Sequence, residues 1–305
     1  ANAWWMDVLE NGGSSPYAAH FGINWRTGPE SLSEKILLPV LGAPYGTVLN
    51  AGEIQLSYGE CGFRLNYWER RLPVAPVTYL DILAPGSEPL LEIPDFQLLV
   101  DILGRLPPRW VTEWEALEVR FQEKENAKRR LWKLYEAEDS VRAHVDRAIV
   151  RINGNSGDPS SFDELHRLLD NQAYRLAYWR VATERINYRR FFDVSDLIGI
   201  RVEDSGVFSD SHRLVLDMVE RGDVDGLRVD HIDGLADPGQ YLERLPHDRV
   251  YLIVEKILGA DEHLCHKWPV HGTTGYDFLG YMNSLFVDER GLDRLSSFYS
   301  EKIGV

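Results

Sequence analysis

The stretch Gly226-Leu227-Arg228-Val229-Asp230-His231-Ile232-Asp233-Gly234-Leu235 holds an arginine, a histidine and two carboxylates within ten residues. A second stretch, the apolar run Val250-Tyr251-Leu252-Ile253-Val254, ends directly in Glu255. Near-continuous apolar runs of this kind are typical of strands that are buried on both faces of a parallel sheet. Two such strands, each delivering a carboxylate at its carboxyl end, are what an active site on an α/β barrel requires. We therefore expect the rest of the chain to support this pair.

The segments around the pair predict an alternation of helices and strands. We expect a helix, a strand, a shorter helix and a second strand over Ser209–Arg221, Val224–Asp230, Pro238–Leu245 and Arg249–Val254. Strand, helix and strand in so short a space make one unit of a parallel sheet. Asp230 and Glu255 would then end neighbouring strands, which lie about 4.8 Å apart. Their carboxyl groups could approach to the roughly 5–5.5 Å that retaining glycosidases use.

In that chemistry one carboxylate attacks the sugar, while the other is protonated first as an acid and later serves as a base. Arg228 lies two residues before Asp230, so both side chains point to the same side of the strand. A neighbouring guanidinium favours an ionised nucleophile at Asp230, and the end of an apolar run suits a protonated Glu255. Two alternatives stay open: a purely structural ion pair, and a metal site made by Asp230, His231 and Asp233.

Composition excludes several classes of function. The formal net charge of −15 argues against a nucleic-acid partner, because phosphates would be repelled. No apolar run approaches the roughly 20 residues of a membrane span, and no signal peptide opens the sequence. The two cysteines, Cys61 and Cys265, have no metal-ligand spacing, so we predict a reducing cytoplasm as the compartment. The sequence predicts no cofactor and no metal, and an acidic enzyme acting on a neutral substrate fits the charge.

The residues before the pair predict a different kind of structure. Glu53–Tyr58 and Phe63–Trp68 alternate like the strands of a hairpin. Helical spacing over Thr112–Glu138 predicts a long helix whose mixed charges face solvent. Ser161, with Glu164 three residues later, matches a capping box that would open a helix through about Arg185. We expect three parts: residues 1–90, irregular with a hairpin; residues 91–205, helical; and residues 206–305, α/β.

These stretches also carry a family resemblance. Gly226–Leu235 resembles the fourth-strand motif of the α-amylase superfamily, glycoside hydrolase family 13, in the form found in the members that make trehalose from maltooligosaccharides. The stretches Trp4–Gly12, Ile186–Asp193, Val254–Leu258 and Trp268–Phe278 resemble other segments of the same group. The resemblance therefore runs from one end of the chain to the other.

The resemblance implies a fold and a reaction. The fold is α/β: part of a (β/α)8 barrel, with its fourth and fifth strands, carrying a large and mainly helical inserted domain that has a small β-hairpin region. The reaction is an intramolecular transglucosylation that turns the reducing-end α-1,4 bond of a maltooligosaccharide into an α,α-1,1 bond. Asp230 would be the nucleophile, Glu255 the general acid/base and Arg228 the partner of Asp230. Substrate contacts are expected at His231, Asn187, Tyr188, Arg189, Tyr276 and Asp277.

The sequence also departs from the family pattern. The superfamily uses a further motif on its third strand and a third catalytic aspartate near its seventh strand, and neither motif is recognisable here. The resemblance therefore implies an interior piece of a longer enzyme, without mutase activity of its own. Two other functions remain as alternatives: a 4-α-glucanotransferase or α-amylase-type hydrolase, and a non-catalytic glucan-binding module.

Overall fold

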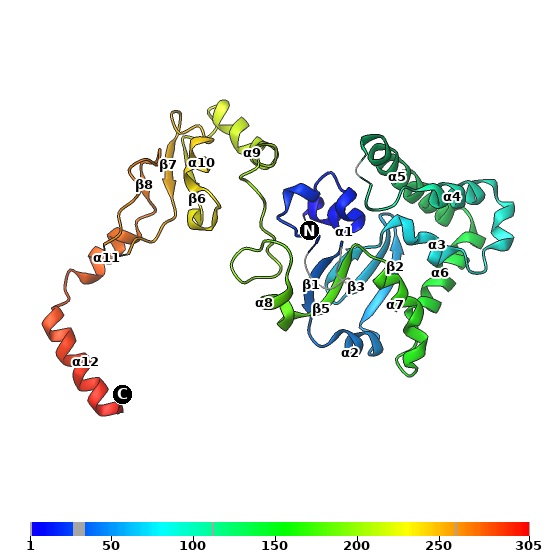
Figure 1. Ribbon diagram of the computed structural model, residues 1–305, viewed down its shortest axis with the longest axis horizontal. Coiled ribbons are helices and arrows are strands. Elements are labelled where there is room, and N and C mark those ends of the chain that lie inside the picture. Colours follow the sequence, from blue (N-terminus) through cyan, green and yellow to red (C-terminus); the bar gives the residue numbers. More distant parts are fainter. Residues whose placement is uncertain (1, 27–33, 112, 260, 305) are drawn as a thin grey trace. The chain divides into compact units, whose positions relative to one another are not determined.

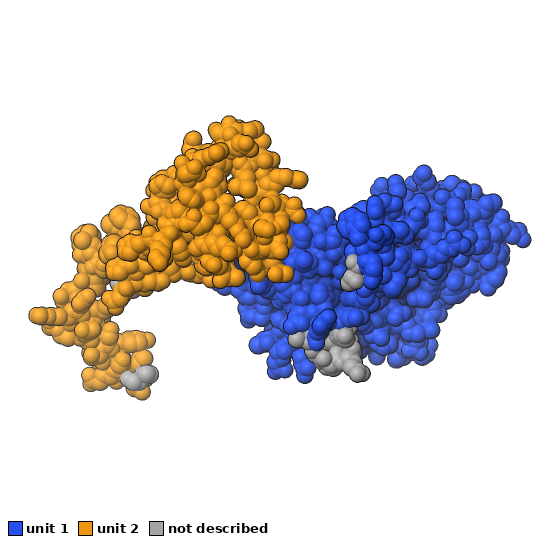
Figure 2. Space-filling view, turned by 45° about the horizontal axis from the view of Figure 1, so that its top comes forward, with its two compact units in different colours: residues 1–200 blue, residues 201–305 orange. Residues whose placement is uncertain are grey.

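A computed structural model describes residues 2–26, 34–111, 113–259 and 261–304. The chain divides into two compact units, residues 1–200 (unit 1) and residues 201–305 (unit 2), coloured separately in Figure 2. Each unit has a hydrophobic core of its own, and that of unit 1 is much the larger. No helix in the described ranges is both long enough and apolar enough to cross a membrane.

Two small sheets form the centre of unit 1 (Figure 1). In the first, β1 (Ile36–Leu41) pairs in parallel with β5 (Tyr174–Tyr178). In the second, β2 (Ile54–Gly59), β3 (Gly62–Tyr67) and β4 (Arg70–Pro73) pair in this order and are antiparallel. The predicted hairpin is confirmed as β2 and β3, and β4 extends it by a strand that the sequence pattern did not reveal.

The helices of unit 1 surround these sheets, and α4, α5 and α6 pack on one another in succession. They are α1 (Ala3–Asn11), α2 (Tyr45–Asn50), α3 (Tyr79–Leu83), α4 (Pro94–Arg105), α5 (Trp114–Ala137), α6 (Asp139–Asn153), α7 (Asp163–Asp170) and α8 (Ala182–Arg185). The predicted helix over 112–138 is confirmed as α5, except that Thr112 lies outside the described residues.

The helix predicted from Ser161 to about Arg185 is wrong. The first half of the predicted range contains α7, which ends at Asp170. The strand β5 then begins at Tyr174, where the prediction has a helix. The Ser161 hydroxyl does not cap α7; it accepts a hydrogen bond from the Asn155 amide at 2.7 Å. Glu164 bonds to Arg151 at 2.9 Å, so the expected capping box does not form. The chain becomes extended at Tyr174 because β1 offers a partner strand there, and this tertiary pairing overrides the local helical signal.

The prediction that the charges of α5 face solvent is also wrong in part. Lys124 is buried in the face that packs on α1, and its ammonium lies 3.2 Å from Asp7, 3.0 Å from Glu10 and 3.0 Å from Glu125. Lys128 adds ion pairs to Glu10 at 3.0 Å and to Glu125 at 2.9 Å. We call these five side chains the α1–α5 ion network. Burial is tolerated because each ammonium has at least two carboxylate partners.

Unit 2 contains three parallel strands in the order β6 (Gly226–Val229), β7 (Tyr251–Val254) and β8 (Gly272–Thr273), drawn in yellow to orange in Figure 1. Helix α9 (Ser205–Glu220) precedes β6, and α10 (Pro238–Glu243) connects β6 to β7. The predicted helix–strand–helix–strand order is therefore confirmed. The core of this unit is small and is made by Phe208, Ile232, Leu242, Leu245, Leu252 and Val254.

The last two helices, α11 (Tyr276–Ser284) and α12 (Glu289–Ile303), follow the sheet. Neither has a buried side chain among the described residues. Their apolar side chains are instead exposed, and Phe286, which lies between the two helices, is 90% exposed.

Candidate active site

The two carboxylates leave the sheet of unit 2 side by side. In the parallel pairing of β6 and β7, Val229 lies opposite Val254, so Asp230 and Glu255 are the next residues of the two strands. The amide of Glu255 continues the ladder by donating to the Val229 carbonyl at 2.7 Å. The predicted neighbouring strands are therefore present, and both acidic side chains stand at their carboxyl ends.

Arg228 connects the two carboxylates. Its Nη1 donates to Oδ1 of Asp230 at 2.5 Å, and its Nη2 lies 3.8 Å from Oε1 of Glu255. The hydrogen bond to Asp230 raises the pKa of the Arg228 guanidinium, which therefore stays charged. The side chain of Asp230 is 64% exposed, whereas that of Glu255 is 22% exposed. The more exposed carboxylate, Asp230, therefore bonds directly to Arg228, and the more buried one, Glu255, lies farther from the guanidinium.

His231 positions Glu255 through its backbone. Its φ of 48° lies in the left-handed region, which is uncommon for a residue with a side chain. This turn directs the His231 amide toward Glu255, and the amide donates to Oε2 at 2.9 Å. Gly234 makes room for the turn, because a Cβ at this position would lie 2.5 Å from Cδ2 of the His231 ring. Glu255 therefore has one oxygen fixed by an amide, and the other faces Arg228.

Tyr276 reaches the same carboxylate from the start of α11. Its hydroxyl donates to Oε1 of Glu255 at 3.4 Å. The next residue, Asp277, accepts a hydrogen bond from the Thr273 hydroxyl at 2.8 Å, which lowers the pKa of Asp277. Thr273 belongs to β8, a strand that was not predicted from the sequence. The contact of Thr273 with Asp277 was also missed, because a strand of only two residues gives no recognisable sequence pattern.

Asp233 does not join Asp230 and His231 in a metal site. Both of its carboxylate oxygens accept from Lys256, at 3.1 and 3.2 Å. Lys256 also bonds to Glu262 at 2.7 Å, and this bond and the one to Asp233 raise the pKa of Lys256. Within the described residues, no group of three or more histidine, cysteine or acidic side chains is arranged to hold a metal ion.

The three remaining predicted site residues belong to unit 1. The Asn187 amide is committed to the backbone, since it donates to the Lys35 and Asn24 carbonyls at 2.8 and 3.1 Å and accepts from the Leu37 amide at 3.0 Å. Tyr188 is buried against Trp5, and the side chain of Arg189 lies beside Gly22. Substrate contact by these residues stays a prediction.

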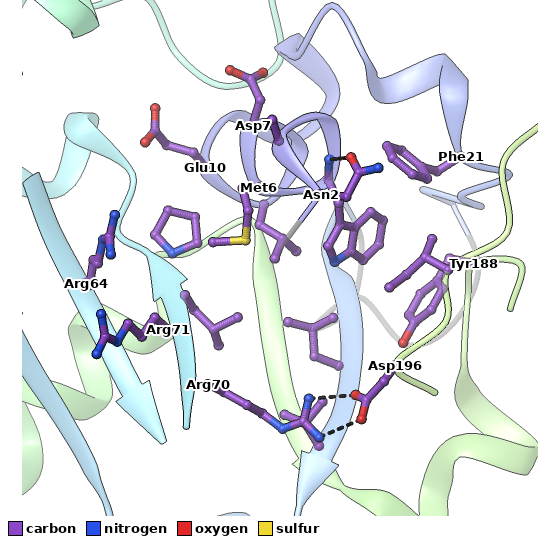
Figure 3. Close-up of a pocket in the computed structure, with 18 of the residues that line it drawn as sticks. Asn2, Met6, Asp7, Glu10, Phe21, Arg64, Arg70, Arg71, Tyr188 and Asp196 are labelled. Carbon is purple, nitrogen blue, oxygen red and sulfur yellow. Dashed lines mark hydrogen bonds and ion pairs between the residues drawn. The ribbon is translucent and has the colours of Figure 1, made fainter. Parts of the chain in front are cut away.

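A cavity of about 1140 Å³ in unit 1 was not predicted from the sequence. Figure 3 shows its lining, which includes Tyr188, Met6 and Arg70. We call it the unit 1 cavity. Its walls come from α1, β1, β3, β4, α5 and residues 188–200, and they contain all five side chains of the α1–α5 ion network. No local pattern could reveal a cavity whose walls come from such distant parts of the sequence.

Comparisons with known proteins cover nearly the whole length of the chain. No family model matches the chain. Curated relatives from two strains of Mycobacterium tuberculosis, named maltooligosyl trehalose synthase, are 30% identical over 307 residues that cover 100% of this chain and 28% of theirs. The chain is similar to maltooligosyl trehalose synthases along its whole length. The resemblance found in the sequence is therefore confirmed.

Solved structures of maltooligosyl trehalose synthases show the same likeness. The Arthrobacter ramosus enzyme is 31% identical, with a TM-score of 0.61, over 99% of this chain and 28% of that one. A Sulfolobus tokodaii protein, titled a hypothetical maltooligosyl trehalose synthase, is 27% identical, with a TM-score of 0.57, over 98% of this chain and 28% of that one. The chain thus spans between a quarter and a third of the length of these relatives.

Proposed function

We propose that this chain carries the nucleophile and the general acid/base of a trehalose-forming glucosylmutase that acts on maltooligosaccharides. Asp230 is the nucleophile, Glu255 the acid/base and Arg228 the group that holds Asp230. The main support is the register of β6 and β7, which brings both carboxylates to the same end of adjacent parallel strands with Arg228 between them. The names of the relatives support the substrate class and a role in trehalose biosynthesis.

The reaction proceeds in two displacements. In the first, Oδ2 of Asp230 attacks the anomeric carbon next to the reducing-end glucose, while Arg228 holds Oδ1. The α-1,4 bond breaks, and Glu255 gives its proton to the departing 4-hydroxyl oxygen. In the second, the anomeric hydroxyl of the released glucose attacks the same carbon, Glu255 takes the proton of that hydroxyl, and the bond between the carbon and Asp230 breaks. Two inversions give net retention and an α,α-1,1 bond.

Transfer must outcompete hydrolysis, so water has to be excluded from the intermediate. We assign this task to His231, Tyr276 and the segment 272–277, including Asp277. The hydrogen bonds of the His231 amide and the Tyr276 hydroxyl to Glu255 support a place for both beside the reacting bond. In Tyr276→Ala, hydrolysis should rise relative to trehalose formation, and an unchanged ratio would count against this assignment.

The finer architecture belongs to the same proposal. We assign residues 206–305 to a segment of a (β/α)8 barrel and residues 1–205 to a domain inserted before it, with Asn187, Tyr188 and Arg189 as its contribution to sugar binding. The three parallel strands of unit 2 and the likeness to solved maltooligosyl trehalose synthase structures support this assignment. Cys61 and Cys265 are both free thiols, which fits a cytoplasmic enzyme.

The test uses maltopentaose and an assay of reducing ends. The protein tested contains this chain together with the segments that the relatives have on either side of the matched region; we call it the longer protein. Mutase action removes reducing ends without adding any, whereas hydrolysis by an amylase creates new ones. Asp230→Asn should abolish the loss of reducing ends. Asp225→Asn, an exposed aspartate just before β6, is the matched control and should keep the activity. Full activity in Asp230→Asn would refute the assignment.

The 305-residue chain should leave maltopentaose unchanged, since it has no recognisable third carboxylate motif. Conversion of maltopentaose by this chain would contradict that expectation. Binding of maltopentaose without conversion would support a glucan-binding role for the chain as it stands.

A further inference from the structure

Two stretches that the family resemblance singled out meet at the unit 1 cavity. Trp4–Gly12 contributes Trp5, Met6, Asp7 and Glu10, and Ile186–Asp193 contributes Tyr188 and Phe191. The two stretches are far apart in the sequence and lie on different elements, α1 and the segment after α8. The reaction proposed at the carboxylate pair uses no residue of Trp4–Gly12. Their meeting point is therefore a candidate for a second function of this chain.

One side of the cavity is aromatic. The Trp5 ring lies 5.2 Å from the Tyr188 ring and 5.0 Å from the Phe21 ring, and all three residues are buried. They form a rigid wall, because each ring is held by its neighbour. Phe191, at the edge of the cavity, is 38% exposed. The rings are tilted against one another, by 56° between Trp5 and Tyr188 and by 69° between Trp5 and Phe21. An apolar wall of this kind, with the more exposed Phe191 ring beside it, suits the apolar face of a ring-shaped ligand.

The other sides are polar, and their charges cancel. Five basic and five acidic side chains line the cavity, although the whole chain carries a net charge of −15. Most of them are paired: Arg70 bonds to both oxygens of Asp196, at 2.6 and 2.8 Å, and Lys128 bonds to Glu10. Figure 3 shows the Arg70–Asp196 pair at one end of the cavity and Glu10 near the other. A neutral lining favours an uncharged ligand over an ionic one.

Two arginines leave hydrogen-bond donors available. Arg64 on β3 and Arg71 on β4 point to the same face of the sheet, since Arg64 lies opposite Pro73 and Asn66 lies opposite Arg71. Neither guanidinium has a side-chain partner among the described residues. Each offers several donors in a fixed plane, an arrangement that can bond neighbouring hydroxyl groups of one ligand.

We propose that the unit 1 cavity binds a stretch of α-1,4-glucan, with the sugar rings against the aromatic wall and their hydroxyl groups toward Arg64 and Arg71. The choice of α-glucan among uncharged polyhydroxylated ligands rests on the proposed function. The lining residues all belong to unit 1, whereas Asp230 and Glu255 belong to unit 2. Binding at this cavity therefore needs neither carboxylate.

The two cysteines make this proposal directly testable. Cys61 is exposed and lines the cavity, and Cys265 is exposed in unit 2. In a Cys265→Ser chain, the alkylation of Cys61 by a fluorescent maleimide should slow as maltoheptaose is added, in proportion to the occupancy of the cavity. At saturation the rate should be about tenfold lower. Cellopentaose, the β-linked counterpart, should leave the rate unchanged. In the matched Cys61→Ser chain, maltoheptaose should not affect the alkylation of Cys265. An unchanged rate at Cys61, or equal protection of both thiols, would overturn the proposal.

A second measurement tests the arginines. The double variant Arg64→Ala/Arg71→Ala should bind maltoheptaose about tenfold more weakly by calorimetry, as expected for the loss of hydrogen bonds from charged donors. Arg147→Ala, an exposed arginine of unit 1 outside the cavity, is the control and should bind like the wild type. Equal affinity of the double variant and the control would contradict the assignment of these donors.

The two proposals can fail separately. Asp230→Asn should keep the protection of Cys61. If it abolishes that protection, the glucan sits at the carboxylate pair, and the cavity proposal is wrong while the proposed function stands. If Cys61 is protected but the longer protein shows no mutase activity, the cavity proposal stands and the proposed function is wrong.

Discussion

Replacing Lys124 by methionine tests whether the α1–α5 ion network stabilises unit 1. Methionine keeps the apolar stem and removes only the charge. The Lys124 side chain is 4% exposed, and those of Glu10 and Asp7 are 10% and 15% exposed. Burial by itself would lower the pKa of Lys124, but Glu10, Asp7 and Glu125 together raise it, so the ammonium is charged. Without it, Lys128 still pairs with Glu10 and Glu125, but Asp7 loses its lysine partner.

Removing one member of a buried ion pair typically costs about 3–5 kcal/mol. Lys128 still bonds to Glu10 and Glu125, so we expect the lower value, about 3 kcal/mol in the free energy of unfolding. With a denaturant slope of about 3 kcal/mol per molar in guanidinium chloride, the unfolding midpoint should fall by about 1 M. Tryptophan fluorescence follows unit 1, because of the nine tryptophans only Trp268 lies in unit 2.

Lys133→Met provides the matched control on the same helix. Lys133 is exposed, and its loss should change the free energy of unfolding by less than about 0.5 kcal/mol. If Lys124→Met and Lys133→Met shift the midpoint equally, the network does not stabilise unit 1 and the reasoning is refuted.

Three further predictions concern single groups. In Gly234→Ala the new methyl group must displace the His231 ring and disturb the hydrogen bond of the His231 amide, so the amide-proton NMR signal of His231 should move upfield. Gly280→Ala, with open space around it, should leave this signal in place. A signal that does not move in either variant would contradict the prediction. The hydrogen bond from Arg70 lowers the pKa of Asp196, so ionised Asp196 stabilises unit 1 above its unfolded pKa of about 3.9, and this contribution is lost as the pH falls through the lower folded pKa. Asp196→Asn should therefore lose less stability in acid than the wild type, as measured by denaturant unfolding, and equal acid sensitivity would exclude this role. Glu255→Gln in the longer protein should slow maltopentaose turnover about 10²–10⁴-fold but slow a substrate with an acidic leaving group much less, and equal loss on both would argue against Glu255 as the acid.

The carboxylate pair could be predicted from the sequence because its signals are local. Apolar runs that end in Asp230 and Glu255 predict strands by themselves, and the short connection between them predicts parallel neighbours. The left-handed turn at His231 was not predictable, because the space that Gly234 leaves for the His231 ring becomes visible only in the folded turn. The sequence shows these two residues close together but not in contact.

The errors in unit 1 have the opposite cause. Lys124 reads as a surface residue because its partners Asp7 and Glu10 lie 117 and 114 residues away in the chain. Likewise, β5 was predicted as part of a helix because its partner strand β1 lies far before it in the sequence. A residue whose environment depends on such distant partners cannot be assigned from its neighbours alone.

The central place of β7 has a consequence for how the chain is synthesised. Among the described strands of unit 2, β7 is the one bonded on both sides, by β6 and by β8. A nascent chain that has been synthesised only as far as Glu255 contains both carboxylates. It still lacks β8, the strand that pairs with the second side of β7. Ribosome-bound chains of increasing length should therefore gain protection of the β7 amides from hydrogen exchange in two steps, the second after Thr273 has emerged. Asp230 and Glu255 should thus become a fixed pair only when a later, two-residue strand arrives.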